Sequence, residues 1–485
     1  MRQPDPPRIL YVRPRQWALD HCACAVDGLM PEPTPAPAPR GLWRQASELF
    51  RAPLPQAHEV FFNPRGAAGP AVLNAPARDL FRAFRQPQPL ASPHAQQLAR
   101  LHLLQPLDQA SSPAPAPAVR PQVLTAWLHV TNACNLRCTY CFVHKNADAM
   151  DETIGRAAVD AVFRSARAEG FRAVKLKYAG GEATLNFDLI RTLHRHARRL
   201  SERHGIALQE VILSNGVALT PAMLDFIRDN DLTLSISLDG LGEGHDAQRV
   251  FANGVGSGPW VRRGIERALD RGVAPHLSIT VTSHNVQELP QVVAFALERQ
   301  LYFNINFYQE HQPWQRHETL RAQNEALIAG LRAALQVIEA DLPPYNVFTS
   351  MLDRANLAAG HTRACGAGDS YLVIDHCGQI ARCQMEMHHP VTDIHAQQPL
   401  ADIRLYEPGD REPHFVDVDD KTECAACPWR YACGGGCTMM TYRVHGRTDV
   451  KSPYCDVYKA IFPEILRLEG LRLLKWEGNA AHAWM

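Results

Sequence analysis

Segments that favour strands alternate with segments that favour helices between residues 123 and 309, and this alternation leaves few possible folds. Six apolar or β-branched runs predict strands, and the stretches between them carry apolar residues at helical spacing. Successive strand–helix–strand units are right-handed, so the strands are expected to be parallel in one sheet, either doubly wound or curled into a partial barrel. In both arrangements chemistry collects at the C-terminal ends of the strands. The predicted strands are residues 123–131, 173–180, 210–216, 232–240, 276–283 and 303–309.

The rest of the chain divides around this region. Pro/Ala-rich segments at residues 31–40 and 111–121 predict extended linkers, and between them two short strands and an amphipathic helix predict a small, separate α+β module. A helical stretch follows the last predicted strand, and cysteines then dominate. The expected domains are an N-terminal module with its linkers (1–121), the strand–helix domain (122–310), a helical bridge (311–360), a cysteine-rich domain (361–460) and a C-terminal helix with a tail (461–485).

Composition narrows the class of protein. Hydrophobic residues make up 46% and charged residues 21% of the chain, which is typical of a folded soluble protein. Lys+Arg and Asp+Glu are 50 each, so no overall field attracts nucleic acid or anionic lipid. No apolar run approaches the roughly 20 residues that cross a bilayer, and the first residues carry Pro and Arg where a signal peptide is apolar. We therefore expect a cytoplasmic protein with neither nucleic acid nor a membrane as its partner.

Three cysteines follow the first predicted strand in the spacing CxxxCxxC: Cys134, Cys138 and Cys141. Thiolates so close together can share one metal centre, and soft sulfur selects zinc, copper(I) or iron–sulfur clusters. Three ligands are one fewer than a structural site uses, so an iron held in this way keeps an open position for chemistry. The alternative is a zinc site completed by His129 or His144.

In this spacing the chain resembles the radical S-adenosylmethionine (SAM) superfamily, whose further motifs follow in order at later strand ends. The resemblance implies a partial (β/α)6 TIM-like barrel and a [4Fe–4S] cluster whose open iron binds the amino and carboxylate groups of SAM. Glycines allow the main chain to approach a ligand closely, a carboxylate accepts hydrogen bonds from the SAM ammonium, and a guanidinium binds the SAM carboxylate through two hydrogen bonds. The residues that the resemblance implies as SAM contacts are Tyr140, Phe142, Gly180, Gly181, Glu182, Ser214, Asn215, Ser237 and Arg249.

A second group of cysteines has the spacing C-x12-G-x4-C, then C-x2-C-x5-C-x3-C, then a final Cys455. It resembles the SPASM extension of radical SAM peptide maturases, which carries two auxiliary [4Fe–4S] clusters, for three clusters in all. A zinc ribbon would explain four of these cysteines but not seven. The resemblance implies that one auxiliary cluster is held completely and the other by three thiolates, the sets being Cys424, Cys427, Cys433 and Cys455, and Cys365, Cys383 and Cys437.

Three cysteines remain. Cys377 lies in the same predicted hairpin as Cys383 and is our candidate for the missing ligand. The alternative is an open iron that binds a substrate thiolate. Cys22 and Cys24, near the N-terminus, are interpreted as incidental.

The resemblance implies a peptide or protein substrate, because SPASM proteins mostly act on such side chains. The N-terminal module looks like the small winged-helix-like domains that recognise leader peptides, and an exposed strand edge there would capture one by β-augmentation. An accessory or dimerisation domain is the alternative. The implied chemistry is cleavage of SAM to a 5′-deoxyadenosyl radical, with an electron from a flavodoxin or ferredoxin, and closure of a thioether or carbon–carbon crosslink.

Two further functions stay open. One is maturation of sulfatases, which oxidises Cys or Ser to formylglycine with the same clusters, and the other is a non-catalytic iron–sulfur electron carrier. Weak candidates for an acid or base are Asp369, Asp375, Tyr308 and Glu310, which lie at predicted strand ends or hairpins.

Overall fold

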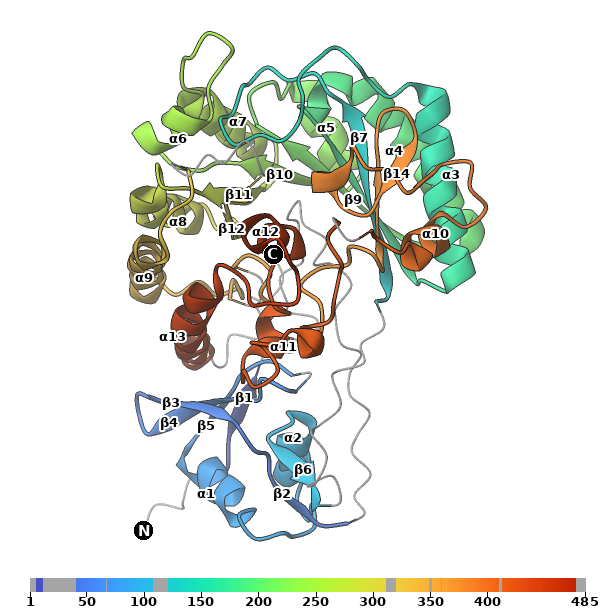
Figure 1. Ribbon diagram of the computed structural model, residues 1–485. Coiled ribbons are helices and arrows are strands. Elements are labelled where there is room, and N and C mark those ends of the chain that lie inside the picture. Colours follow the sequence, from blue (N-terminus) through green and yellow to red (C-terminus); the bar gives the residue numbers. More distant parts are fainter. Residues whose placement is uncertain are drawn as a thin grey trace.

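The computed structural model describes residues 6–11, 41–66, 68–107, 121–310, 320–348, 351–358, 360–409 and 412–476. Cys22, Cys24 and nearly all of the two Pro/Ala-rich segments lie outside these ranges. A nine-stranded sheet forms the centre of the molecule, with the N-terminal module below it in Figure 1. None of the described helices combines the length and apolar character that a bilayer crossing requires.

Six parallel strands of this sheet lie side by side in chain order, which confirms the predicted parallel sheet of a mixed α/β fold. Because the order never reverses among them, the doubly wound alternative is wrong. The sequence placed all six, with ends displaced by up to three residues. They are β7 (Val123–Thr131), β8 (Ala173–Gly180), β9 (Ala207–Ser214), β10 (Thr233–Ser237), β11 (His276–Val281) and β12 (Phe303–Phe307).

Helices cover the outer face of these strands (Figure 1), and their apolar faces share one core with alternate residues of the sheet. Local chemistry sets their ends: the Asp151 side chain accepts from the Ile154 amide at 2.8 Å to begin α3, and Gly170 ends it with φ +74°. The helices are α3 (Glu152–Glu169), α4 (Phe187–His204), α5 (Pro221–Asp229), α6 (Glu243–Gln248), α7 (Gly258–Asp270), α8 (Leu289–Glu298) and α9 (Asn324–Ala340). Two 3₁₀ turns, η3 (Ala183–Asn186) and η4 (Val286–Glu288), precede α4 and α8.

The cysteine-rich region extends the central sheet instead of forming a sheet of its own. Strand β13 (Tyr371–Ile374) pairs with β7 in parallel, and β14 (Gln379–Ala381) and β15 (Thr392–Asp393) follow in antiparallel pairing. Cys365 and Cys383 therefore lie at the same sheet that carries the first cysteine loop. The remaining elements are η5 (Gln384–Glu386), α10 (Pro399–Leu405), η6 (Val418–Asp420), α11 (Arg430–Cys433), α12 (Thr438–His445) and α13 (Cys455–Lys475).

The N-terminal module contains the two strands and the helix that the sequence predicts, and further elements complete it. Its main sheet has the antiparallel order β1-β5-β4-β3, and two short strands pair separately. The elements are β1 (Ile9–Tyr11), β2 (Trp43–Gln45), β3 (Phe50–Leu54), β4 (His58–Phe62), β5 (Ala71–Leu73), α1 (Ala75–Ala83), α2 (Pro93–Arg100) and β6 (Leu104–Pro106).

The N-terminal module has an apolar core of its own, and one face of its sheet also packs against α13, a contact that the sequence did not predict. Leu54 and Val60 form an apolar cluster with Leu471 and Leu473 of that helix, and α13 lies directly over the blue sheet in Figure 1. A Cβ at Gly470 would lie 2.8 Å from a methyl group of Leu54, so glycine allows this close approach. The apolar residues of a strand face gave no indication of which surface would cover them.

Candidate active site

The loop with the first three cysteines leaves the C-terminal end of β7 and is anchored on both sides. The Gly181 amide donates to the Thr131 carbonyl at 2.7 Å, and the Glu182 amide donates to the Ala133 carbonyl at 2.8 Å. On the other side, the Thr139 amide donates to the Gln248 carbonyl at 2.9 Å. The loop thus has a fixed position between the ends of β8 and α6.

The two glycines after β8 serve this anchoring. A Cβ at Gly180 would lie 2.4 Å from the Thr131 carbonyl oxygen, and one at Gly181 would lie 2.4 Å from that of Ala133. Real Cβ atoms do not approach backbone so closely, so glycine is required at both positions. Gly180 and Gly181, which the resemblance implies as SAM contacts, therefore also have a structural role: they allow the end of β8 to pack against the cysteine loop.

Glu182 joins two strand ends. Its carboxylate accepts from the Ser214 hydroxyl at 2.8 Å, from the Asn215 amide at 2.6 Å and from the Thr184 hydroxyl at 2.6 Å. These bonds satisfy a carboxylate that is 2% exposed. The structure thus brings three of the predicted SAM-contact residues together at the ends of β8 and β9, while Ser237 is the last residue of β10.

Two cations lie close to the three cysteines. The Lys145 ammonium lies 2.8 Å from the Cys141 Sγ. Burial raises the pKa of Cys138 to about 11, and the Arg249 guanidinium opposes this rise. Cations beside thiols stabilise the ionised form that binds metal. The donor set fits an iron–sulfur cluster with one open iron. His129 contacts Asn132 through Nε2 at 2.7 Å.

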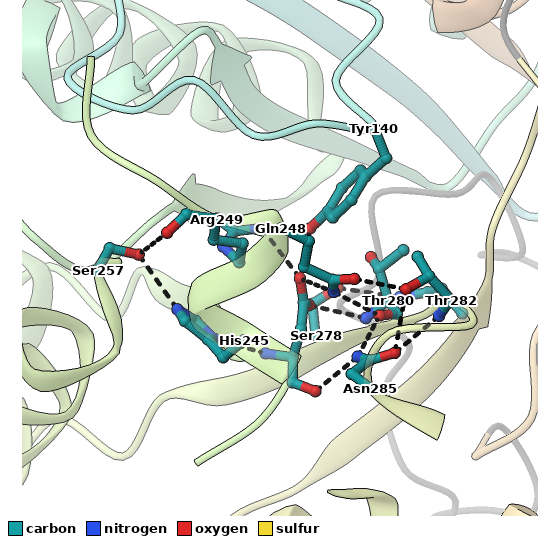
Figure 2. Close-up of polar contacts among 11 residues, drawn as sticks. Tyr140, His245, Gln248, Arg249, Ser257, Ser278, Thr280, Thr282 and Asn285 are labelled. Atoms are coloured by element: carbon teal, nitrogen blue, oxygen red, sulfur yellow. Dashed lines mark hydrogen bonds and ion pairs between the residues drawn. The ribbon is translucent and has the colours of Figure 1, made fainter. Parts of the chain in front are cut away.

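A buried polar network holds Tyr140 of this loop (Figure 2). The Tyr140 hydroxyl donates to Asp239 at 2.6 Å and accepts from Arg249 at 2.5 Å. The Gln248 side chain donates to the same oxygen of Asp239, Oδ2, at 2.9 Å. The other oxygen, Oδ1, accepts from the Thr280 amide, also at 2.9 Å. Asp239 therefore links the cysteine loop to β11 and to α6 without exposure to water.

More residues extend the network away from the loop. The Asn285 side chain donates to the carbonyls of Asp239 at 2.6 Å and Thr280 at 2.8 Å, and the Thr282 hydroxyl donates to Gln248 at 2.5 Å. His245 and Ser257, also drawn in Figure 2, contact each other at 3.1 Å. Sequence reasoning missed this network, although the position of Asp239 directly after a buried strand was available as a signal.

Arg249 is the residue whose surroundings best fit a bound anion. It is 6% exposed, lies 3.6 Å from Asp239, and its Nε has no hydrogen-bond partner among the described residues. A buried guanidinium N–H without an acceptor is rare in folded proteins. It is the donor that a carboxylate ligand would use, so the residues present fit the carboxylate of SAM.

The other seven cysteines gather into two sets. Cys383 interacts with Cys365 and Cys437, which raise its pKa in addition to the larger effect of burial. Burial likewise raises the pKa of Cys433 to about 12, with contributions from the three remaining thiols of its set. Those are Cys424, Cys427 and Cys455. These are the same sets of three and four that the resemblance implies.

The structure does not bring Cys377 to the set of three. Cys377 is exposed at the tip of the β13–β14 hairpin, beside Asp375 and Asp148. Cys383 lies beyond the other end of β14, and three extended residues span about 10 Å. A ligand of the same cluster would have to lie much closer, so the hairpin geometry contradicts Cys377 as the fourth ligand.

The four acid–base candidates separate into two pairs. Asp369 forms an ion pair with Arg404 at 3.2 Å, and Asp375 accepts from two amides of its own turn. Tyr308 and Glu310 lie together after β12; burial and the Glu310 carboxylate raise the pKa of Tyr308. One oxygen of Glu310 is buried and has no hydrogen-bond partner among the described residues.

A cavity of about 300 Å³ opens between the first cysteine loop and the β13–β14 hairpin. His129 and Phe142 line it from the loop side. Gln384 and Met385, which directly follow Cys383, line it from the hairpin side together with Asp375. The cavity thus lies next to both the SAM-type cysteine motif and the set of three cysteines.

This combination of a parallel sheet, a cysteine loop at the first strand end and polar residues at the following ends defines a class of SAM-dependent radical enzymes. Residues 128–296 match the family model described as the Radical SAM superfamily. The chain therefore contains a radical SAM domain and is an enzyme of the radical SAM superfamily.

Two relatives match over most of their length. Pre-heme d1 synthase of Dinoroseobacter shibae is 23% identical over 72% of this chain and 90% of its own. A cysteine-type anaerobic sulfatase-maturating enzyme of Clostridium perfringens is 21% identical over 68% of this chain and 93% of its own.

Solved structures show the same fold at low identity. The native anaerobic sulfatase-maturating enzyme anSMEcpe with bound AdoMet has a TM-score of 0.58 at 17% identity and covers 73% of this chain and 98% of its own. Streptococcus suis SuiB bound to its precursor peptide SuiA has a TM-score of 0.50 at 14% identity and covers 85% of this chain and 99% of its own.

Proposed function

We propose that this chain is a radical SAM maturase that installs a thioether or carbon–carbon crosslink in a ribosomally made peptide or protein. The observation that carries the proposal is the gathering of seven cysteines into two sets. One set includes Cys383, and the two residues after it line the cavity beside the first cysteine loop. The relative named as a sulfatase-maturating enzyme, together with the similar structure of SuiB bound to a precursor peptide, supports the substrate class. We further propose that the six parallel strands curve into a partial barrel and that the protein is cytoplasmic.

In this proposal Cys134, Cys138 and Cys141 hold a [4Fe–4S] cluster, which when bound supplies the electron that cleaves SAM to a 5′-deoxyadenosyl radical. The electron comes from a low-potential donor such as flavodoxin or ferredoxin. Arg249 binds the SAM carboxylate through its unused Nε, and the network around Asp239 fixes Tyr140 so that the loop does not shift. Such fixed positioning is what radical abstraction of one hydrogen requires.

The two further sets hold auxiliary [4Fe–4S] clusters, with Cys424, Cys427, Cys433 and Cys455 closing one of them. The set of three leaves a position for a substrate thiolate. Closing a crosslink removes one hydrogen atom, one proton and one electron from the substrate, so a proton acceptor and an electron acceptor are both needed. We assign the role of proton acceptor to Glu310, which has a buried carboxylate oxygen without a hydrogen-bond partner among the described residues.

The N-terminal module, in this proposal, is a winged-helix-like domain that binds the leader segment of the substrate. Within the described residues, β3 pairs only with β4, so its outer edge offers backbone groups to an added strand. Because the module packs on α13, a leader bound there would hold the rest of the peptide at a fixed distance from the cavity.

The test is mass spectrometry of the peptide encoded beside the gene, co-expressed anaerobically with wild type or with a Cys134/Cys138/Cys141→Ala variant. Loss of the mass of two hydrogens per crosslink, with wild type only, supports the proposal. A peptide in which one Cys or Ser has become an aldehyde supports sulfatase-type maturation instead. Production of 5′-deoxyadenosine, measured separately, tests the catalytic class against a mere electron carrier.

A further inference from the structure

Lys421 is a buried cation in an unusual position. It follows η6, is 1% exposed, and its ammonium donates to the carbonyl oxygens of Thr448 at 2.8 Å and Val450 at 3.3 Å. None of the described carboxylates lies within ion-pair distance of it. A buried ammonium with only neutral acceptors is costly, so a negative charge is expected nearby.

Thiolates that hold a cluster would provide that charge. Two contacts place Lys421 beside them: the Cys424 amide donates to the Lys421 carbonyl at 3.0 Å, and the turn between Cys433 and Cys437 packs against the lysine stem at Gly435. The groups with the strongest favourable interactions with the Lys421 ammonium are Cys424, Cys437 and Cys433, and they oppose the lowering of its pKa by burial. Asp449 contributes less and is itself paired with the exposed Arg447 at the surface. Cys437 belongs to the set of three and the other two thiols to the set of four, so Lys421 lies between the sets.

The backbone is shaped around this side chain. Gly434, Gly435 and Gly436 all have positive φ, at +52°, +76° and +70°. A Cβ at Gly435 would lie 2.7 Å from both Cδ and Cε of Lys421. Gly435 thus lets the lysine stem pass close to the turn between Cys433 and Cys437, whereas Gly434 and Gly436 make room for Ala364 and Ser452.

We propose that Lys421 is a positioning residue that compensates the thiolates of both cysteine sets and favours the reduced state of the clusters they hold. This inference rests on the auxiliary clusters of the proposed function. Reduction adds a negative charge to a thiolate-bound cluster, and a fixed ammonium in a buried site stabilises that charge more than water-screened surface lysines do. Lys421 therefore raises the reduction potential of the auxiliary clusters and eases transfer of the substrate electron to them.

The experiment uses the full chain with Cys134, Cys138 and Cys141 replaced by Ala, reconstituted anaerobically with iron and sulfide. Lys421→Met removes the charge at similar length, and Lys421→Arg keeps it. Lys451→Met is the matched control, because Lys451 lies near Cys455 but is 45% exposed and paired with Glu423. Iron content and dithionite titration followed by electron paramagnetic resonance give the readouts, neither of which needs a substrate.

We expect Lys421→Met to lower the reduction equilibrium constant of at least one auxiliary cluster about tenfold, which is about 59 mV for a one-electron couple. Lys421→Arg and Lys451→Met should stay within about threefold of the parent. Loss of iron in Lys421→Met with retention in Lys421→Arg would equally support compensation by charge. Unchanged potentials in Lys421→Met, or iron loss in both Lys421 variants, would overturn the inference.

The same experiment separates this inference from the proposed function. If wild type binds iron for one cluster only and the parent protein without its first three cysteines binds none, the auxiliary clusters do not exist and the proposed function fails with them. If the parent binds iron and only the Lys421 comparison fails, the proposed function stands and the inference about Lys421 is wrong.

Discussion

The two cysteine regions of this protein are held in place by different means. The first loop begins at the end of a regular strand and is fixed by backbone hydrogen bonds to β8 and by the buried network around Asp239. The C-terminal sets lie among short elements and turns, where the glycines at 434–436 and the buried Lys421 shape the chain. The comparison teaches that hydrogen bonds to regular strands hold the first region, whereas turn glycines and one buried cation hold the second.

The substitution with the largest expected effect tests whether the two cysteine regions assemble independently. Replacing Cys134, Cys138 and Cys141 by Ala should abolish 5′-deoxyadenosine formation, because the predicted SAM contacts Glu182, Asn215 and Arg249 gather around this loop, and should leave the auxiliary iron in place. Iron analysis and chromatography of SAM products measure both quantities. Loss of all iron in this variant would mean that the second region cannot assemble without the first.

Asp239→Asn should weaken the first region strongly. The substitution leaves the Arg249 guanidinium without its buried counter-charge, and breaking such a pair costs about 3–5 kcal/mol. We expect a lower melting temperature for the metal-free protein and weaker SAM binding by the reconstituted one. Asp225→Asn is the control, because its ion pair with Arg271 is exposed and solvent screens it. Equal effects of the two substitutions would contradict the structural importance of the network.

Gly470→Leu should detach the N-terminal module without disturbing either cysteine region. The added side chain would collide with Leu54 and Val60, and overpacking of this kind costs about 1–3 kcal/mol. Limited proteolysis should then release the module faster than in wild type, while iron content stays the same. Lys459→Leu, at an exposed position of the same helix, serves as the control and should not change the cleavage rate.

The sequence predicted the strands and the cysteine sets because both are local patterns. Alternation of strand and helix signals placed β7 and β8 with their observed ends, and the resemblance carried by the cysteine spacing implied the set of three and the set of four. The buried network around Asp239 depends on contacts between residues up to about a hundred positions apart, which no local pattern encodes. Docking of the N-terminal sheet on α13 was missed for the same reason, because an apolar strand face does not identify its partner.

Cys377 gives the smallest expected effect and the sharpest limit of sequence reasoning. Both cysteines belong to the β13–β14 hairpin region, yet Cys377 lies in the turn before β14 and Cys383 lies beyond the other end of that strand. Cys377→Ser should therefore leave iron content and cluster spectra unchanged, whereas Cys383→Ser should remove the cluster of the set of three. A loss of iron in Cys377→Ser would require the hairpin to rearrange when iron binds, and the second cysteine region would then be less ordered before cluster assembly than its glycines and buried lysine indicate.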